Sequence, residues 1–422
     1  MNLSAQRLLP ALLAASILSA CATAPAAKTP VPFSLLVFGD HGYDLDYLEA
    51  KDRNPPRTLE EAIAYERQKW IKEKRPPAEF EPPSMVQLPS TGGYVLASGA
   101  MPVANAMRSH CATVRCDAAV MLGDNIYPNG PTGGADGVDD AKRFDEILLT
   151  PFRDFGKLAP DFRIYVTLGN HDWRTSREAA LGEVRYFETT RPFYMDGIRY
   201  RVQPPAAHGD VEIFALDTEV LLAGTTVYDD LLADDGSELP PVKVDVPEPW
   251  TKPANDDELR MVEWLERSLR ESHARWKIVI GHHPLWSSAG GKFEEAKVMR
   301  RLILPTLCRY ADMYLAGHEH TLEVHTDSCA NALPGTNAPP LPQLVSGAGA
   351  KHRPVNSWFQ AHQTKKSPEL TTLFAKGIIW GFMHLTFEQD RVVVNVITTP
   401  NDGSGSTTVE YTQSFARRGM RE

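Results

Sequence analysis

The amino-acid sequence predicts an α/β fold, and two patterns along the chain indicate it. Short runs rich in β-branched and aromatic residues alternate with longer segments that carry apolar residues at helical spacing. Five of the short runs stop at a glycine that is followed by Asp, Asn or His. Ligands of α/β proteins gather at the carboxyl ends of strands, so this repeated ending predicts one site built from several loops.

The expected elements follow in chain order. Strands are expected at 33–38, 118–122, 163–168, 211–216, 276–280 and 312–316, and closing strands at 343–346, 380–387 and 391–397. Helices are expected around 59–73 and at 103–110, 140–155, 257–273 and 294–310. In the segment 257–273, Leu259, Val262, Leu265 and Leu269 fall on one helical face. Residues 401–422 are expected to form a partly ordered tail.

The composition excludes several classes of protein. The chain has 422 residues, of which 42% are hydrophobic and 23% charged, which excludes a polytopic membrane protein, a coiled coil and a disordered chain. Its formal net charge is -10, and no dense stripe of Lys and Arg is present, so no nucleic-acid-binding surface is expected. Most of the length, 33–400, is predicted to be a single catalytic domain, because the strand-end residues must converge on one site.

Two segments interrupt the alternation of strands and helices. Residues 44–99 are rich in proline and charge, and residues 225–253 are acidic and contain proline, so both are predicted to be insertions. The first insertion has two readings: a solvated surface, or a lid that sets substrate specificity. Pocket width would depend on both segments.

The N-terminus predicts export. Residues 1–20 combine Arg7, a short apolar core and small residues, as a signal peptide does. Leu18-Ser19-Ala20-Cys21 resembles the lipobox of bacterial lipoproteins, in which the cysteine is lipidated, and Ala22 in that family implies the outer membrane. The resemblance implies a lipoprotein facing the periplasm or the cell surface, with residues 21–32 as a tether. An ordinary cleaved signal with an incidental cysteine is the alternative.

Four cysteines remain after Cys21: Cys111, Cys116, Cys308 and Cys329. An even number in an exported protein allows two disulfides, and the local pairs are the simplest of three possible connectivities. Free buried thiols are the alternative.

The residues at the strand ends predict a dinuclear metal site. Carboxylate, amide and imidazole groups suit two adjacent divalent or trivalent cations, with one carboxylate bridging them. The candidate ligands are Asp40, Asp124, Asn170, His282, His318 and His320. In Gly317-His318-Glu319-His320 the two histidines are spaced so that they can reach two metals from one turn.

The ordered motifs resemble those of the calcineurin-like metallophosphoesterases, and within them the purple acid phosphatases of the small tartrate-resistant type. The motifs are Gly-Asp-His-Gly (39–42), Gly-Asp-Asn-Ile-Tyr (123–127), Gly-Asn-His-Asp (169–172), Val-Ile-Gly-His (279–282) and Gly-His-Glu-His (317–320). The resemblance covers about 33–398 and implies a four-layer α/β/β/α sandwich with mixed sheets and a site at the strand carboxyl ends.

The first motif separates this chain from most metallophosphoesterases, because Gly42 stands where they carry a metal-binding histidine. Purple acid phosphatases lack the same histidine and use the tyrosine of the second motif, here Tyr127. The resemblance therefore implies Fe(III) and a divalent ion (Fe, Zn or Mn). Its Fe(III) ligands would be Asp40, Asp124, Tyr127 and His320. Its divalent-metal ligands would be Asp124, Asn170, His282 and His318.

Further residues are candidates for catalysis and substrate binding. His171 resembles the family's general acid or phosphate-binding histidine, and Asp172 is expected to orient it. His41 and His283 are candidates to line the substrate pocket, with packing beside the site as the alternative.

The predicted function is hydrolysis of phosphomonoesters by in-line attack of a metal-bound hydroxide. A phosphodiesterase or nucleotide pyrophosphohydrolase on the same site is the alternative, and a non-catalytic surface binding lipoprotein is less favoured because the set of ligands is complete. The expected partners are phosphate-ester small molecules or phosphoproteins, with the membrane reached through the lipid anchor only.

Overall fold

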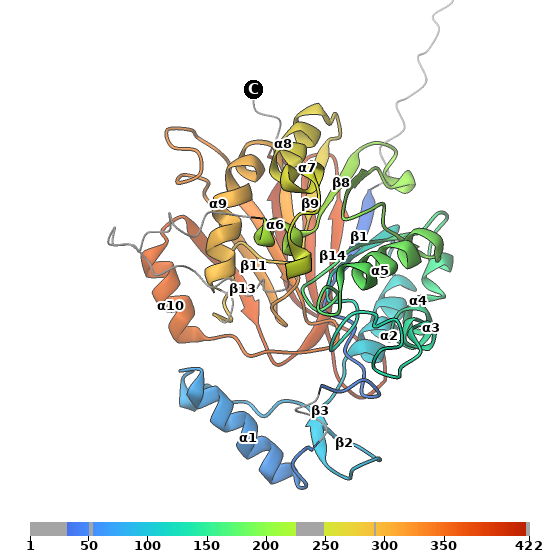
Figure 1. Ribbon diagram of the computed structural model, residues 1–422. Helices are drawn as coiled ribbons and strands as arrows, with labels where there is room; N and C mark the ends of the chain where they lie inside the picture. The colour runs from blue at the N-terminus through green and yellow to red at the C-terminus, as the bar shows by residue number, and fades with distance from the viewer. Residues whose placement is uncertain (1–31, 50–53, 225–248, 291–292, 419–422) are drawn as a thin grey trace, which may run out of the picture. The chain divides into compact units, whose positions relative to one another are not determined.

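The computed structural model of this protein describes residues 32–49, 54–224, 249–290 and 293–418, all within one structural unit (Figure 1). The predicted signal peptide, lipobox and most of the tether lie outside the described residues, as does most of the predicted insertion 225–253. None of the helices in the described part has the length and hydropathy needed to cross a bilayer.

The first sheet has seven strands in the order β16-β15-β14-β1-β4-β5-β6. The strands are β1 (Phe33–Phe38), β4 (Ala118–Leu122), β5 (Ile164–Thr167), β6 (Phe193–Tyr194), β14 (Trp380–Phe387), β15 (Arg391–Thr399) and β16 (Thr408–Ala416). β1, β4, β5 and β6 are parallel, and β14 runs antiparallel to β1. Every residue of β1 and β4 is buried, as expected for central strands that are covered on both faces.

The second sheet also has seven strands, in the order β13-β11-β12-β10-β9-β8-β7. The strands are β7 (Arg199–Val202), β8 (Val211–Leu216), β9 (Trp276–Ile280), β10 (Met313–Ala316), β11 (Leu322–Asp327), β12 (Leu341–Ser346) and β13 (Leu370–Lys376). β8, β9, β10 and β12 are parallel, so their carboxyl ends lie at the same edge. Strands β7 and β11 are antiparallel to their neighbours.

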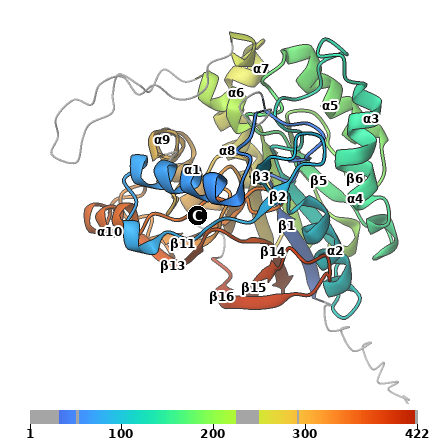
Figure 2. The same cartoon turned by 90° about the horizontal axis from the view of Figure 1, so that it is seen from below.

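The two sheets pack on each other, with β12 against β14 and β5 against β8. Helices cover the outer faces: α2 packs on β14 and β15, and α8 packs on β8 (Figures 1 and 2). The main helices are α1 (Leu59–Lys72), α2 (Ala100–Cys111), α5 (Arg177–Thr189), α6 (Thr218–Ala223), α7 (Asp256–Leu259), α8 (Met261–Glu271), α9 (Phe293–Tyr310) and α10 (Ser357–Lys366). The predicted α/β fold with mixed sheets is confirmed.

The insertion after residue 44 contains α1 and a two-stranded sheet, formed by β2 (Met85–Gln87) and β3 (Tyr94–Leu96). Figure 1 shows α1 beside this hairpin at one end of the sheets. The predicted helix around 59–73 is present, and it begins with a capping box between Thr58 and Glu61.

Two expectations about the elements were wrong in part, and several elements were not expected. The tail contains β16, which pairs with β15 through eight residue pairs, because its alternating pattern suits an edge strand with one exposed face. The predicted helix 140–155 is broken into α3 (Asp140–Phe144), a π-helical turn (Asp145–Leu149) and α4 (Thr150–Phe152). Pro151 has no N–H and cannot continue an α-helical ladder. Strands β11 and β13 and helices α5 and α10 were not predicted at all.

Both local disulfides form, Cys111–Cys116 and Cys308–Cys329, so the simplest pairing is confirmed. The first closes the end of α2, and the second joins α9 to the loop after β11.

Candidate metal centre

All the predicted metal ligands converge where the two sheets meet. The loops after β1, β4 and β5 supply Asp40, Asp124 and Asn170 from the first sheet. The loops after β9 and β10 supply His282 and the histidine pair of the Gly-His-Glu-His turn from the second sheet. The parallel strands of both sheets therefore end at one site, as the strand-end rule predicts.

The backbone at three of these ligands is left-handed. Asp40, Asp124 and His318 have φ angles of 55°, 53° and 67°, which are uncommon for residues with a side chain. Each follows a glycine, and a Cβ added at Gly317 would lie 2.6 Å from Asp40 Oδ2. The turns are tight because glycine lets the two loops approach this closely, and the strained backbone aims the side chains at one point.

The first group of side chains surrounds the Tyr127 hydroxyl. This hydroxyl lies 2.7 Å from Asp124 Oδ2, 3.1 Å from Asp40 Oδ1 and 3.1 Å from His320 Nε2. His320 Nε2 is in turn 3.4 Å from Asp40 Oδ1. Tyr127 is fully buried. The structure thus brings the four predicted Fe(III) ligands together.

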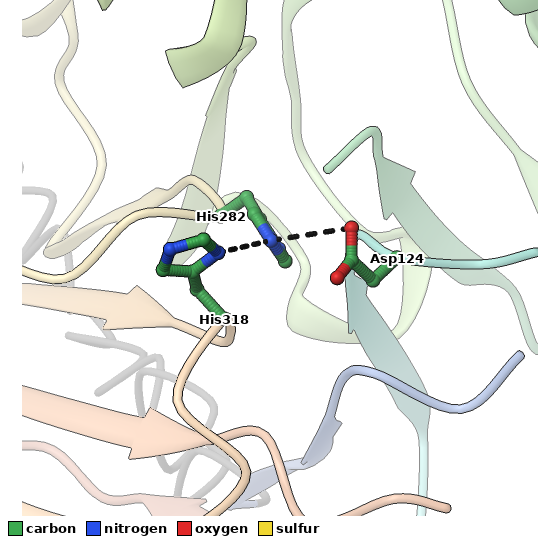
Figure 3. Close-up of side chains that lie close together, drawn as sticks. All are labelled: Asp124, His282 and His318. Carbon is green, nitrogen blue, oxygen red and sulfur yellow. Dashed lines mark hydrogen bonds and ion pairs between the residues drawn. The ribbon is translucent and has the colours of Figure 1, made fainter. Parts of the chain in front are cut away.

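The second group surrounds His282 Nε2. This atom lies 2.9 Å from His318 Nδ1, 3.3 Å from Asn170 Oδ1 and 3.4 Å from Asp124 Oδ1. Figure 3 shows Asp124, His282 and His318 facing one another. The other ring nitrogen, Nδ1, donates to the Leu122 carbonyl oxygen at 2.7 Å. This bond leaves the Nε2 lone pair free for a metal.

The two groups share Asp124 and fit two cations. In each group the ligand atoms of Asp, Glu and His lie within 4.8 Å of one another. Burial raises the pKa of Asp40, and repulsion from Asp124 adds to this. Burial also raises the pKa of Tyr127, as do the two carboxylates beside it. Buried negative groups at this distance are stabilised by a multivalent cation, and the mixed oxygen and imidazole donors suit a transition metal.

A further carboxylate, which the sequence analysis did not identify, holds one of the ligands. Glu295 Oε2 lies 2.9 Å from His318 Nε2, on the side of the ring away from His282. Such a carboxylate fixes the tautomer and orientation of a metal-binding histidine. Glu295 lies in the first turn of α9, and no motif in the sequence marks it.

His283 is buried beside the ligands of the second group, with its ring centroid 5.1 Å from that of His282. Its Nδ1 is 2.7 Å from Thr218 Oγ1, and its ring centroid is 4.4 Å from that of His318. These contacts are those of the alternative, a histidine packed beside the ligands. The side chains of His283, Glu295 and His318 also lie close enough together to hold a metal ion. In the structure, however, His283 bonds to Thr218, and Glu295 bonds to the His318 ring and holds it in place.

His41 is also a core residue. Its ring is fully buried and packs against Phe152 with a centroid distance of 4.5 Å, and against Phe38 at 5.8 Å. Burial lowers the pKa of His41 to about 3. The structure places His41 in the core and not at a pocket wall, because the loop after β1 turns its ring onto Phe38 and Phe152.

His171 faces the metal centre. Its Nε2 lies 3.9 Å from Asp124 Oδ2, and its ring is 4.1 Å from the Tyr127 ring between centroids. Nδ1 lies 2.6 Å from the Pro128 carbonyl oxygen and donates to it, so Nε2 carries the lone pair toward the site. Burial lowers the pKa of His171 to about 3, against the opposing effect of Asp124.

We expected Asp172 to orient His171, but the structure shows a different role. Its carboxylate accepts hydrogen bonds from the backbone N–H groups of Gly169 (2.7 Å), Asn125 (2.9 Å) and Ile126 (3.0 Å). These bonds join the Asp124 loop to the Asn170 loop. The donors are backbone amides with no side-chain signature, so the sequence alone could not show this role.

Lys351 is a second residue at the site that the sequence analysis did not identify. Its Nζ lies 4.4 Å from the Tyr127 ring centroid and 3.3 Å from Glu49 Oε1. Lys351 follows β12, whose carboxyl end lies at the same edge as those of β9 and β10. Applying the strand-end rule to β12 would have found it.

Comparison with known proteins agrees with this geometry. Residues 101–322 match the family model of calcineurin-like phosphoesterases. Purple acid phosphatase 4 from Arabidopsis thaliana is 29% identical over 279 residues, which cover 65% of this chain and 68% of that protein. Tartrate-resistant acid phosphatase type 5 from Homo sapiens is 30% identical over 215 residues, which cover 50% of this chain and 57% of that protein. The chain thus spans 57% to 68% of the length of these two relatives.

Two solved structures share the fold. The purple acid phosphatase PPD1 from yellow lupin (Lupinus luteus) seeds superposes with a TM-score of 0.50 at 15% identity, covering 92% of this chain and 54% of that one. GAP50, the anchor in the inner membrane complex of Plasmodium, superposes with a TM-score of 0.55 at 14% identity, covering 92% of this chain and 90% of that one. At these identities the similarity shows the fold alone.

Proposed function

Because this chain belongs to the calcineurin-like phosphoesterase family, we propose that it hydrolyses phosphate monoesters at a dinuclear metal site, as a purple-acid-phosphatase-like enzyme. The observation that carries the proposal is the pair of ligand groups that share Asp124. Small phosphate esters or phosphoproteins are the proposed substrates, and turnover at a phosphodiester is the alternative.

The donor set decides which metals we propose. Fe(III) would be held by Asp40, Asp124, Tyr127 and His320, since a phenolate is a hard anionic ligand. A divalent Fe, Zn or Mn ion would be held by Asp124, Asn170, His282 and His318. When bound, two such cations neutralise phosphate charge and lower the pKa of water.

The chain's own residues bind the ester and move a proton. His171 Nε2 faces the centre, so it is the atom that would hold a proton for a phosphate oxygen or for the leaving alkoxide. Because burial lowers the pKa of His171 to about 3, we propose that it is charged only when an anionic ester lies beside it. Lys351 Nζ supplies a positive charge beside Tyr127, where it attracts an anionic ester. Glu295 holds the His318 ring in place through Nε2.

The fold alone does not decide between a catalyst and a binding protein, since GAP50, an anchor, also has it. A protein that only binds a partner does not need a complete set of metal-binding side chains, whereas a dinuclear enzyme loses its site when one of them is lost. In this chain both groups are complete and His171 lies beside them. We therefore favour the enzyme over a non-catalytic surface protein.

The test is hydrolysis of p-nitrophenyl phosphate and of bis(p-nitrophenyl) phosphate by the protein loaded with iron and zinc. Asp124→Asn removes the shared carboxylate charge, so we expect monoester turnover to fall by on the order of 100-fold or more. Asp327→Asn is the matched control, because Asp327 is also buried but bonds to Trp286 and Cys329. Equal turnover by wild type and Asp124→Asn would refute the site, and faster diester turnover would favour the alternative.

A further inference from the structure

A cavity of about 690 Å³ lies between the insertion after residue 54 and the segment 351–354, and it reaches His320. Because His320 belongs to the first ligand group, the cavity leads away from the metal centre. Ligand pockets for drug-sized molecules have volumes of about 300–1,000 Å³. The space therefore holds far more than a phosphate ion.

The wall formed by the insertion is fixed to the catalytic domain by hydrogen bonds. Arg75 Nη1 donates to the Pro354 carbonyl oxygen at 2.7 Å, and Ser98 Oγ donates to that of Tyr43 at 2.6 Å. Inside the insertion, the Tyr94 amide donates to the Pro56 carbonyl oxygen at 2.8 Å. A wall held at several points can present side chains in fixed positions to a ligand.

Two cationic side chains, Lys351 and Arg353, line the cavity beside His320, and each is paired with a carboxylate outside the lining, Glu49 or Glu319. Lys351 Nζ lies over the Tyr127 ring and 5.0 Å from the Tyr43 ring centroid. The Arg353 amide donates to the His320 carbonyl oxygen at 2.8 Å, and its guanidinium pairs with Glu319. This part of the cavity suits the phosphate group of an ester.

The wall of the cavity that the insertion forms carries four aromatic side chains. Tyr65 and Trp70 on α1, Phe80 after it and Tyr94 on β3 line this wall. The Trp70 indole N–H donates to the Pro76 carbonyl oxygen at 2.8 Å, which holds its ring. The lining also carries Glu66, Glu73 and Glu81 together with Arg57 and Lys69, and Lys69 pairs with Glu66, so this wall is polar as well as aromatic. Flat rings in a partly polar wall stack on planar groups.

We propose that this cavity is the leaving-group subsite of the enzyme, and that it selects phosphate monoesters whose alcohol carries a planar aromatic group, such as a nucleoside 5′-monophosphate. The inference rests on the proposed phosphatase activity. The phosphate lies near Lys351 and Arg353 beside the ligands, and the aromatic group stacks on the insertion wall.

The experiment compares two substrates in one set of variants. Adenosine 5′-monophosphate carries a planar group, and glycerol 2-phosphate does not. In the double variant Tyr65→Ala/Tyr94→Ala we expect the ratio of kcat/KM for the two substrates to fall about tenfold, since two ring contacts are lost. Ile71→Ala is the control, because Ile71 is on α1 and exposed but does not line the cavity.

Binding of two non-hydrolysable phosphonates gives a second measurement that does not need turnover. The double variant should weaken phenylphosphonate relative to methylphosphonate by about tenfold, by calorimetry. An unchanged ratio in both assays, with wild-type turnover intact, overturns the subsite and leaves the phosphatase proposal standing. If the wild type hydrolyses p-nitrophenyl phosphate but neither of these esters, the subsite is overturned alone. If it hydrolyses none of the three, the proposed function falls as well.

Discussion

Tyr127 is the residue that distinguishes a purple acid phosphatase centre from other metallophosphoesterase centres. Its hydroxyl contacts three predicted ligands of the first metal. If Fe(III) binds there, Tyr127→Phe should abolish the visible tyrosinate-to-iron absorption and lower the iron content, because a hard ligand is lost. Metal analysis and the visible spectrum measure this.

Tyr165→Phe is the control for Tyr127→Phe, because Tyr165 is buried in β5 but is not among the residues around the metal centre. It should keep the colour. Wild-type protein that binds only zinc or manganese, with no colour to lose, would contradict the iron assignment and leave the phosphoesterase assignment intact.

His171 is predicted to act on the substrate without holding a metal. Replacing it by glutamine should lower kcat for p-nitrophenyl phosphate by about 10²–10⁴-fold, the usual contribution of an acid–base group, with the metal content unchanged. His384→Gln is the control for this variant. His384 is also buried, but its ring bonds to the Arg115 carbonyl oxygen and not to a residue of the metal centre. Loss of metal from the His171 variant would argue for a ligand or a structural role.

Residue identities at this site were predictable where chemistry restricts them. Asp40, Asp124 and His318 each follow a glycine at a strand end, and metal binding tolerates few other side chains there. Glu295 and Lys351 were not predictable from motifs. A carboxylate that contacts the His318 ring, or a cation beside Tyr127, can come from many positions in the sequence. His41 and His283 pack beside the ligands, since a residue next to a ligand in the sequence need not face the same site.

At the scale of elements, Asp172 joins the loop after β4 to the loop after β5, and these loops carry Asp124 and Asn170. Asp172→Ala leaves the amides of Gly169, Asn125 and Ile126 without their acceptor inside the protein. A buried donor without a partner costs about 1–3 kcal/mol, so the free energy of unfolding should fall by about 2–5 kcal/mol. Urea denaturation measures the change.

Asp172→Asn should recover part of this stability, because its amide oxygen still accepts. Asp196→Ala is the control, since Asp196 is exposed. If Asp172→Ala were no less stable than Asp196→Ala, the bonds that join the two loops would carry no net stability.

Elements were predictable where a buried run is long and uniform. Strands β1, β4 and β9 are mostly apolar, fully buried and close to their predicted limits. Strand β13 escaped prediction because most of its residues are half-buried, so its pattern is weak. Strand β16 carries many polar residues, so its sequence resembles that of a tail. It is a strand because it pairs with β15.

At the scale of the whole molecule, the open question is where the enzyme is held. The lipobox-like Leu18-Ser19-Ala20-Cys21 and the Ala/Pro-rich residues up to 32 predict a lipid anchor followed by a tether. Eleven extended residues span at most about 40 Å, enough to carry the catalytic unit clear of the headgroups. A membrane-held enzyme with its site at the strand ends would act on esters diffusing in the periplasm or outside the cell.

Lipidation of Cys21 gives the last prediction. Cells grown with radiolabelled palmitate should label the wild-type protein, and Cys21→Ser should stay unlabelled because no thiol is left to carry the diacylglycerol. Thr23→Ser keeps the cysteine and should be labelled like the wild type. An unlabelled wild type would favour an ordinary signal peptide, and the enzyme would then be free after export. Membrane fractionation alone is the weaker test, since an uncleaved signal peptide also holds a protein at the membrane.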